Sequence, residues 1–477
     1  MQATNTVTDP QSSGIPSAPP SRPRTLVLCF DGTSNNYDAT NTNVVKLFSM
    51  LKQDTEEQVC YYQAGIGTYF QPGVVSPLLK WFATIADEAV AWYLGQHIRE
   101  GYTFLMQNYR EGDKICIFGF SRGAYTARAL AGMLYKIGLL GKDNPEQVPF
   151  AYKLYKRTDK TGIQLSAGFK QTFCQNVSVE FLGVWETVSS VGVIMGKTLP
   201  FTNSNTSIKT FRQALALDEH RAKFLPNLYH RPSPNPSQEP ANANPIASTL
   251  PTTANPFTEM PTSLRKLNIF KKSKGKETNG YIGGHDESIV GITSGVDEVK
   301  DATDSLEVWF AGCHSDVGGG SVPDTTENSL SQTTLRWMVR EIITSQCGIL
   351  LDSAAMRRNG IYAVDDIAVF QISPVDAGPH ELAKDQVDAL EPIHDPLKQT
   401  PLWWILEVLP TQQVYQGCEG QWVNKWSIHL GKGRKIPFCD KNSGPRFHVS
   451  VKERMEDQKL KYKPKAVWPQ GTEVYVQ

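Results

Sequence analysis

A serine between two glycines stands at the junction of a predicted strand and a predicted helix. Residues Lys114 to Ile137 read KICIFGFSRGAYTARALAGMLYKI, and the G-x-S-x-G pattern centres on Ser121. An apolar strand, this pattern and a helix in succession predict a nucleophile elbow, which raises the serine hydroxyl above the edge of a sheet. The helix N-terminus and the N–H of Arg122 would then stabilise an oxyanion during attack on an ester. We therefore expect Ser121 to be a catalytic nucleophile.

A serine hydroxyl is a weak nucleophile, and it needs a base within hydrogen-bond reach. On sheets with this elbow the order along the chain is serine, acid, histidine. The chain has nine histidines, eight of them after Ser121, and His314 directly follows an apolar strand-like run and precedes a glycine run. We expect His314 to be the base, with His448, in the strand-like segment FHVSV, as the second candidate.

The acid that orients the histidine should lie between the other two residues in sequence. Glu186 follows a predicted strand at 177–184, and glutamate replaces aspartate in some triads, although its longer arm must fold back. Asp218 and Asp316 are alternatives, and Asp316 is so near His314 that fixing the histidine loop is its other expected role. Glu186 is the acid that we expect.

The second oxyanion donor is expected in the loop that follows the first strand. The run TLVLCF leads into Asp31, Gly32 and Thr33, and the N–H of Gly32 or Thr33 would be the donor. We expect Asp31 to brace this loop by accepting backbone N–H groups, or to orient Arg122. The letters FDGT also suggest a D-x-D-G-T phosphatase, but position 29 is Cys, so that motif lacks its nucleophilic aspartate.

The elements that must position these residues alternate between strands and helices. The pattern predicts strands at 25–30, 59–63, 115–118, 177–184 and 306–311, and helices at 43–52, 78–109, 124–137, 208–221 and 330–343. This alternation predicts a three-layer α/β-hydrolase-like fold, with a mostly parallel sheet covered by helices on both faces. Loops at the carboxyl ends of such strands meet at one edge, where ligands bind.

Composition divides the chain into a catalytic domain with flanking and inserted segments. Residues 1–24 are rich in proline and serine and predict a disordered tail. Residues 231–276 are rich in Pro, Asn, Ser and Thr and end in a basic cluster, which predicts a disordered insertion in a surface loop. The catalytic domain is expected at 25–347. Residues 348–477 are expected to form a C-terminal extension that packs on this domain or caps it.

Charge and cysteine usage exclude several classes of protein. The 48 Lys and Arg residues balance the 48 Asp and Glu residues, which argues against nucleic acid as a partner. No run is apolar enough for a transmembrane segment, and the N-terminus lacks the apolar core of a signal peptide, so we expect a cytoplasmic protein. The eight cysteines form no CxxC motif and no cluster with histidine, so we expect no metal and no cofactor.

Longer motifs in a fixed order carry a resemblance to a known family. They read LCFDGTSNN, GFSRGAYTAR, FLGVWETVSSVG, ALALDEHR and WFAGCHSDVGGG, followed by WWILEVLP and HLGKGR. From about Thr25 to Arg454 the chain resembles the α/β-hydrolase-like family named for bacterial type VI secretion phospholipase effectors. The resemblance implies a serine lipid-esterase fold with Ser121 as nucleophile and His314 as base, and it implies aspartate where this chain has Glu186.

These observations predict a serine hydrolase that cleaves carboxylic esters through an acyl-enzyme. Lipids, phospholipids or small esters are the expected substrates, and transient contact with a membrane surface is compatible with this activity. The alternative is a catalytically weak or inactive binding protein of the same fold, which the glutamate at position 186 favours.

Overall fold

The computed structural model of the 477-residue chain describes residues 23–32, 37–53, 55–65, 87–188, 199, 205–229, 303–362, 379–416, 422–437 and 444–477. Disorder is expected for the tail at 1–24 and the insertion at 231–276, and all of these residues except 23 and 24 lie outside the described part of the chain. Arg24 is described, and its guanidinium pairs with Asp113 at 2.7 Å.

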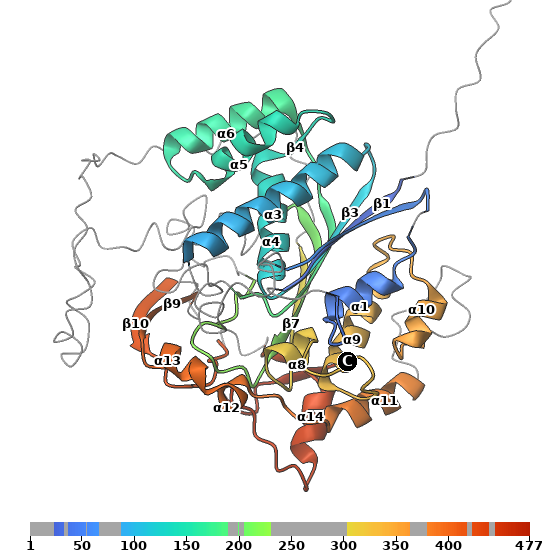
Figure 1. Cartoon of the computed structure of the whole chain (residues 1–477), viewed down its shortest axis with the longest axis vertical. Helices are drawn as coiled ribbons and strands as arrows, with labels where there is room; N and C mark the ends of the chain where they lie inside the picture. The colour runs from blue at the N-terminus through green and yellow to red at the C-terminus, as the bar shows by residue number, and fades with distance from the viewer. Residues whose placement is uncertain are drawn as a thin grey trace, which may run out of the picture.

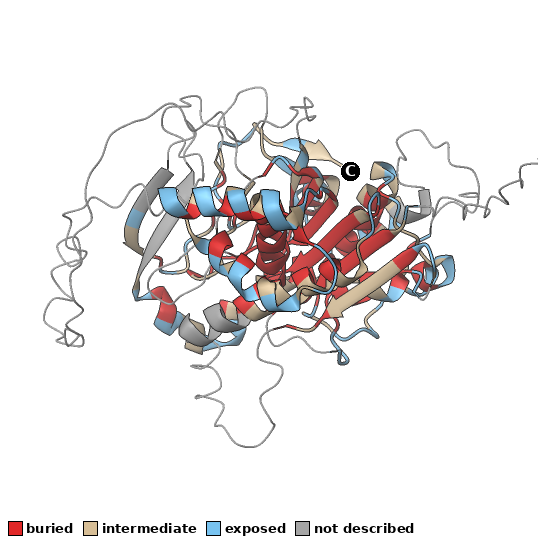
Figure 2. Ribbon diagram, turned by 90° about the horizontal axis from the view of Figure 1, so that it is seen from above, coloured by how far each residue is buried: buried red, intermediate tan, exposed pale blue. Residues whose placement is uncertain are grey.

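An eight-stranded sheet forms the middle of the molecule, in the order β12-β11-β8-β7-β6-β3-β1-β2, and every neighbouring pair in it is parallel (Figure 1). Its strands are β1 (Thr25–Phe30), β2 (Gln58–Gln63), β3 (Lys114–Phe120), β6 (Val179–Trp185), β7 (Ile208–Ala216), β8 (Asp304–Phe310), β11 (Arg446–His448) and β12 (Val474–Val476). Because crossover helices cover parallel strands on both faces, β1 and β3 are buried almost throughout and read as nearly continuous apolar runs. The burial view shows this core between two layers of half-exposed helices (Figure 2).

Helices cover both faces of the sheet, so the predicted three-layer α/β fold is confirmed. One face is covered by α3 (Asp87–Asn108), α4 (Arg122–Ile137), α5 (Val148–Lys156) and α6 (Lys160–Phe173), whose apolar residues share a core with β1, β3 and β6. The other face is covered by α1 (Asn43–Met50), α9 (Leu330–Ser345) and α10 (Ser353–Arg358). The remaining small elements of this part are β4 (Leu139–Leu140), η1 (Pro145–Gln147), β5 (Cys174–Gln175) and α8 (His314–Gly318).

The strands and helices around the predicted elbow are confirmed. Strand β3 ends at Phe120 and α4 begins at Arg122, with the serine between them. The helix predicted at 78–109 is present from Asp87 to Asn108, and its first residues lie outside the described part of the chain.

The helix predicted at 208–221 is wrong, because this segment is strand β7 followed by a loop. Apolar residues at Ile208, Phe211 and Leu215 fit a helical period, which made the pattern ambiguous. Strand β7 lies between β6 and β8, so both of its faces are buried and its apolar residues need not alternate with polar ones.

Residues after 348 add to the sheet and to the region beyond the carboxyl ends of the strands. They supply β11 and β12, and a series of short elements: α11 (Pro379–Ala389), α12 (Pro396–Gln399), η4 (Pro401–Trp403), α13 (Trp404–Glu407), β9 (Pro410–Gln416), β10 (Trp422–Ile428) and α14 (Val449–Glu456). Strands β9 and β10 form a separate antiparallel hairpin beside α13 (Figure 1). Among the described helices, none combines the length and the apolar character that crossing a bilayer requires.

Candidate active site

Ser121 occupies a sharp turn between strand β3 and helix α4. Its backbone has φ 58° and ψ −119°, a strained conformation for a residue that has a Cβ. The N–H of Ser121 donates to the carbonyl of Trp185 at 3.0 Å, which ties the turn to the end of β6. Strain at this position lifts the side chain out of the sheet, as a nucleophile elbow requires.

The two glycines of the elbow allow α4 to start directly against the sheet. A Cβ on Gly123 would lie 2.2 Å from the carbonyl oxygen of Phe30 and 2.5 Å from that of Asp31. A Cβ on Gly119 would lie 2.5 Å from the carbonyl oxygen of Gly123. Since all of these contacts are to backbone atoms, no side-chain movement could relieve them.

Three side chains from different strand ends form one hydrogen-bonded line. The Nε2 atom of His314 lies 2.8 Å from Ser121 Oγ, and its Nδ1 atom lies 3.0 Å from Glu186 Oε2. Ser121 is 8% exposed, whereas Glu186 is fully enclosed. Serine, imidazole and carboxylate in this order are the geometry that lets an imidazole take a proton from a serine hydroxyl.

The carboxylate of Glu186 is directed back over the sheet by its own backbone. Glu186 has φ 50°, and its N–H donates to the carbonyl of Ala214 at 2.9 Å. The N–H of Ala216 donates to Glu186 Oε1 at 2.6 Å. The left-handed turn at the end of β6 therefore supplies the fold-back that the longer glutamate arm needs.

Arg434 is a component of this site that sequence reasoning missed. Its Nη1 and Nη2 atoms lie 2.7 and 2.8 Å from the two carboxylate oxygens of Glu186. The same guanidinium donates to the carbonyls of Ala216 and Phe224 at 2.8 and 2.6 Å. The motif HLGKGR, which ends at Arg434, was the available signal, but nothing in its spacing related it to Glu186.

Charge and burial set the protonation states of the acid and the base. Burial raises the pKa of the Glu186 carboxyl, but the Arg434 charge and the hydrogen bond from His314 outweigh it and hold this pKa below its usual range. Burial lowers the pKa of His314, and Glu186 reverses only part of this effect. At neutral pH the pair is thus a carboxylate and a neutral imidazole, whose free Nε2 can accept a proton.

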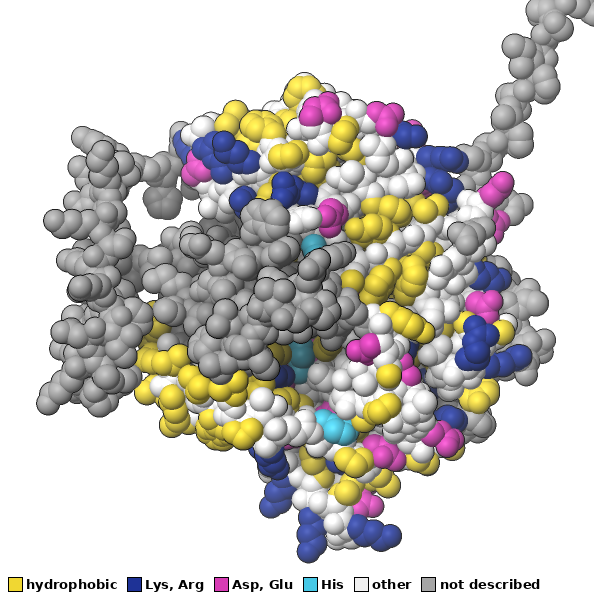
Figure 3. Space-filling view, in the orientation of Figure 1, with side chains coloured by type: hydrophobic (Ala, Val, Ile, Leu, Met, Phe, Trp, Pro, Cys, Tyr) yellow, Lys and Arg dark blue, Asp and Glu magenta, His cyan; other side chains and the backbone are white. Residues whose placement is uncertain are grey.

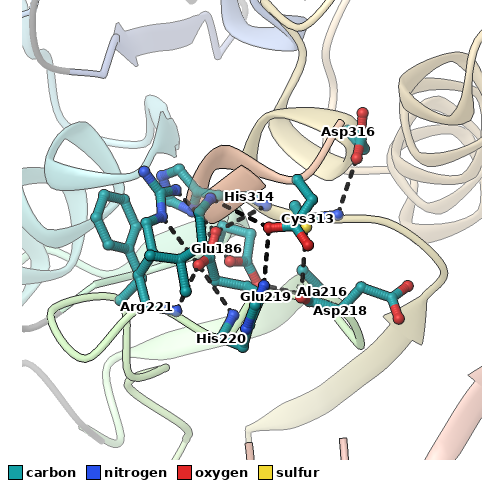
Figure 4. Close-up of polar contacts among 12 residues, drawn as sticks. Glu186, Ala216, Asp218, Glu219, His220, Arg221, Cys313, His314 and Asp316 are labelled. Atoms are coloured by element: carbon teal, nitrogen blue, oxygen red, sulfur yellow. Dashed lines mark hydrogen bonds and ion pairs between the residues drawn. The ribbon is translucent and has the colours of Figure 1, made fainter. Parts of the chain in front are cut away.

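A second buried acid, Glu219, holds the backbone on which His314 sits (Figure 4). Its carboxylate accepts the N–H of His314 at 3.2 Å and two N–H groups of the Arg221 guanidinium at 2.9 and 2.7 Å. Burial raises the pKa of Glu219, but Arg221 overcomes this effect and holds it at about 2. Glu219 therefore stays ionised and fixes the start of α8.

Aromatic rings enclose the imidazole. The rings of Phe120 and Phe224 lie 4.7 and 4.8 Å from that of His314. The Arg221 guanidinium lies 3.5 Å from the centre of the Phe224 ring. These contacts limit the rotation of His314 and keep water away from its ring.

The rival acids hold other groups. Asp316 accepts the N–H of Cys313 at 2.9 Å and bonds the backbone and the ring of His394 at 3.0 and 2.8 Å, so it fixes the histidine loop. Asp218 accepts bonds from Gly312, Tyr462 and Lys465. Both carboxylates are thus bonded to groups other than the His314 ring.

The second candidate base lies elsewhere on the sheet. The His448 ring bonds Ser450 Oγ at 2.8 Å and stacks on Phe310 at 4.9 Å between ring centres. Its other nitrogen lies 3.5 Å from Arg340. The structure thus brings His314, and not His448, to Ser121.

The loop after β1 is braced by Asp31. The carboxylate of Asp31 accepts the N–H of Gly32 at 2.6 Å, the hydroxyl of Thr42 at 2.9 Å and the hydroxyl of Tyr62 at 2.8 Å. In this arrangement the Gly32 N–H is already occupied as a donor, and Thr33 lies outside the described residues. Arg122 begins α4, and burial lowers the pKa of its side chain to about 10, which leaves it charged at neutral pH.

The described residues hold no group of three or more His, Cys, Asp or Glu side chains suited to a metal ion. A hydroxyl, a neutral imidazole and a buried carboxylate can carry out attack on an acyl carbon and proton transfer to a leaving group.

Comparison with protein families gives one match over most of the chain. The model of the family described as "T6SS, Phospholipase effector Tle1-like, catalytic domain" matches residues 24–341. This range contains Ser121, Glu186 and His314, and it ends before Arg434. A relative in Saccharomyces cerevisiae, the uncharacterized protein YEL023C, is 29% identical over an aligned length of 537 residues. The alignment covers 88% of this chain and 78% of the relative.

Two solved structures match at low identity. An uncharacterized protein from Pseudomonas aeruginosa is 18% identical, with 77% of this chain and 53% of that one covered and a TM-score of 0.34. The Tle1 effector bound to the VgrG spike of the Type 6 secretion system is 16% identical, with 74% and 66% covered and a TM-score of 0.28. The chain thus spans about half of the first solved chain and just under two thirds of the second.

Proposed function

We propose, from the premise that this chain belongs to the family of Tle1-like phospholipase effector catalytic domains, that it is a serine hydrolase of carboxylic esters in lipids. Ser121 would be the nucleophile, His314 the general base and acid, and Glu186 the residue that orients the imidazole. The family supports a phospholipase-type hydrolase, and the roles of the three residues rest on their geometry. The observation that carries the proposal is the continuous line from Ser121 Oγ through His314 to Glu186, at 2.8 and 3.0 Å.

The reaction divides into two steps that use the same groups. In the first, His314 Nε2 takes the hydroxyl proton while Ser121 Oγ attacks the ester carbon, and the resulting imidazolium returns this proton to the leaving alcohol. An acyl-enzyme remains on Ser121. In the second, His314 takes a proton from water, the hydroxide attacks the acyl carbon, and Ser121 leaves with the proton from the imidazolium. The products are a carboxylic acid and the free enzyme.

Three features support transition-state stabilisation at this site. The N–H of Arg122 lies at the start of α4, next to the nucleophile, where the helix dipole favours negative charge. The imidazolium that forms on His314 would face the buried carboxylate of Glu186. Enclosure by Phe120 and Phe224 lowers the local dielectric and strengthens these interactions.

A cytoplasmic location belongs to this proposal as an expectation. A lipid substrate agrees with the family and with the aromatic enclosure of the site. The second candidate function, a binding protein that has lost turnover, drew its support from the glutamate at position 186. The contact of Glu186 with His314 supports the hydrolase over that alternative.

The proposal is tested with a panel of p-nitrophenyl esters and phospholipids. Wild type, Ser121→Ala and Glu186→Ala would be compared, with circular dichroism to verify that each variant is folded. We expect Ser121→Ala to abolish turnover, and Glu186→Ala to lower kcat by about 10⁴-fold, as loss of the orienting acid does in serine hydrolases. Full activity in both folded variants would refute the assignment.

A further inference from the structure

A group of large apolar side chains is exposed on and beside helix α13. We call Trp404, Ile405, Val408, Leu409 and Leu430 the α13 surface; their side chains are between 42% and 52% exposed. The N–H of Leu430 donates to the carbonyl of Glu407 at 3.1 Å, which joins the two segments. The space-filling view shows apolar side chains gathered over α12 and α13 (Figure 3). Five such residues in one place are more than the scattered exposure that a protein surface ordinarily shows.

A buried carboxylate holds this surface in place from below. Glu407 accepts the N–H of Ala222 at 2.6 Å, the N–H of Gly431 at 2.8 Å and a bond from the His429 ring at 2.8 Å. Leu406 is buried beside it. In this single helical turn Leu406 and Glu407 point inward, so the residues before and after them point outward. The exposure of the α13 surface is thus a consequence of a fixed backbone.

Aromatic contacts connect this surface with the candidate active site. The ring of Trp403, which directly precedes α13, lies 5.5 Å from that of Phe224. Phe224 in turn lies 4.8 Å from the ring of His314. The Arg221 guanidinium is 4.8 Å from the Trp403 ring and spans the same junction. Two ring contacts therefore lead from the catalytic imidazole to the edge of the apolar surface.

In the described residues 395–409 and 422–435, the exposed charged side chains are all lysines. Lys398, Lys425, Lys432 and Lys435 are exposed, whereas the acids Asp395 and Glu407 are buried. Asp395 is bonded to His220 at 2.8 Å, and Lys398, 3.9 Å from it, has a side chain that is 79% exposed. Apolar side chains flanked by lysines complement a surface that presents acyl chains and anionic head groups.

We propose that the α13 surface binds the protein to an anionic phospholipid bilayer and so brings the candidate active site to its substrate. This inference rests on the proposed function for its choice of partner. Trp404 and its apolar neighbours would enter the level of the head groups, where tryptophan is favoured, and the lysines would contact lipid phosphates and carboxylates. The occupant is thus a lipid surface, as distinct from a second copy of the chain or a protein partner.

The experiment measures flotation of Ser121→Ala protein with vesicles, so that hydrolysis does not alter them. The vesicles contain phosphatidylcholine alone, or phosphatidylcholine with phosphatidylserine. The double variant Ile405→Ser/Val408→Ser replaces side chains that are 46% and 50% exposed. Its matched control is Leu165→Ser/Val387→Ser, which replaces side chains 47% and 49% exposed on α6 and α11.

We expect the α13 double variant to bind both kinds of vesicle about tenfold more weakly, since apolar area would no longer leave water. The control should bind as Ser121→Ala alone does. Lys432→Glu should weaken binding to phosphatidylserine vesicles by at least about fivefold, and leave binding to phosphatidylcholine nearly unchanged. Equal flotation of the α13 variant and its control would overturn the proposal. The proposal would also be overturned if the only effect of the α13 double variant were a change in the oligomeric mass of the protein, measured without vesicles. The surface would then bind a second copy of the chain.

Hydrolysis of a soluble p-nitrophenyl ester separates this inference from the proposed function. In the Ser121-intact background, Ile405→Ser/Val408→Ser should keep its rate on the soluble ester and lose rate on phosphatidylserine vesicles. Vesicle binding without any ester hydrolysis would refute the proposed function and leave the surface supported. Ester hydrolysis without vesicle binding would refute the surface alone.

Discussion

The guanidinium of Arg434 pairs with both carboxylate oxygens of Glu186, at 2.7 and 2.8 Å, in a site that excludes water from both side chains. The pair joins the end of β6 to a residue 248 positions later in the chain. The Arg434 charge is the largest of the influences that keep the pKa of the buried Glu186 carboxyl low. The candidate triad therefore depends on a fourth side chain, which lies beyond the residues matched by the family model.

Loss of Arg434 should affect both stability and catalysis. Replacing it by methionine would leave Glu186 as an unpaired buried charge, and we expect a loss of about 3–5 kcal/mol in the free energy of unfolding. The conservative variant Arg434→Lys keeps the charge but loses the two-pronged geometry, so it should fold, with kcat lowered about 10–100-fold. Urea unfolding and ester hydrolysis measure these effects. A folded Arg434→Lys with the kcat of wild type would show that the pair does not position Glu186.

The pH profile of kcat/KM should report the protonation of His314. Its pKa lies below the ordinary value of about 6.5 because of burial, and the base must be neutral to act. The midpoint of the acid limb, where half of the plateau activity remains, should therefore lie below pH 6.5. Glu186→Gln removes a charge that raises the pKa of His314, so the decline should move to still lower pH while the plateau falls.

The control for this profile is a substrate series. Esters with leaving groups of different basicity should give the same acid limb, because kcat/KM reports groups of the free enzyme. A decline centred above pH 6.5 in wild type, or a Glu186→Gln profile shifted upward, would contradict the assignment of the base.

The elbow should tolerate no side chain at Gly123. Gly123→Ala would bring a Cβ within 2.2 Å of the Phe30 carbonyl, so α4 would have to move away from β1. We expect a loss of several kcal/mol, of the order seen for overpacked cores, together with loss of turnover. Gly168 is the matched control, since it is an exposed helical glycine whose Cβ would meet nothing within 4 Å. Gly168→Ala should stabilise by about 0.5–1 kcal/mol, and equal thermal shifts in the two variants would contradict this account of the elbow.

His448 should influence stability without taking part in catalysis. Burial, with Arg340 and Arg336 nearby, lowers its pKa well below 6.5, so the folded chain excludes a proton that the unfolded chain binds. This difference in proton binding does not lower the free energy of unfolding above pH 6.5. Below that pH the unfolded chain takes up the proton, and the free energy of unfolding falls by up to about 1.4 kcal/mol per pH unit. His448→Gln should reduce this slope in urea unfolding and keep kcat/KM within about threefold. A large loss of turnover in the folded variant would return His448 to the list of candidate bases.

The sequence was most informative where one local pattern fixes both structure and position. The flanks of Ser121 predicted the elbow, and the strand before His314 predicted its arrival at the same edge of the sheet. Parallel strands carry their carboxyl ends to one rim, so order along the chain was enough to bring Glu186 to the same place. The structure brings these three together at the distances given above.

The sequence was least informative where distant segments meet. Arg434 contacts Glu186 across a separation that no periodic pattern encodes. The pattern at 208–221 predicts a helix although residues 208–216 form a strand, because a strand buried on both faces has no alternation to identify it. The occupation of the Gly32 N–H by Asp31 depends on a loop conformation, which composition does not specify.

Covalent labelling of Ser121 by a fluorophosphonate tests the central claim most directly, because the reagent needs an activated serine and no particular lipid. Peptide mass spectrometry should place the adduct on Ser121 in wild type, with a labelling rate reduced by orders of magnitude in His314→Gln. Folded Ser121→Ala should acquire no adduct. A wild-type protein that leaves Ser121 unmodified, or that carries its adduct on another serine, would contradict the account.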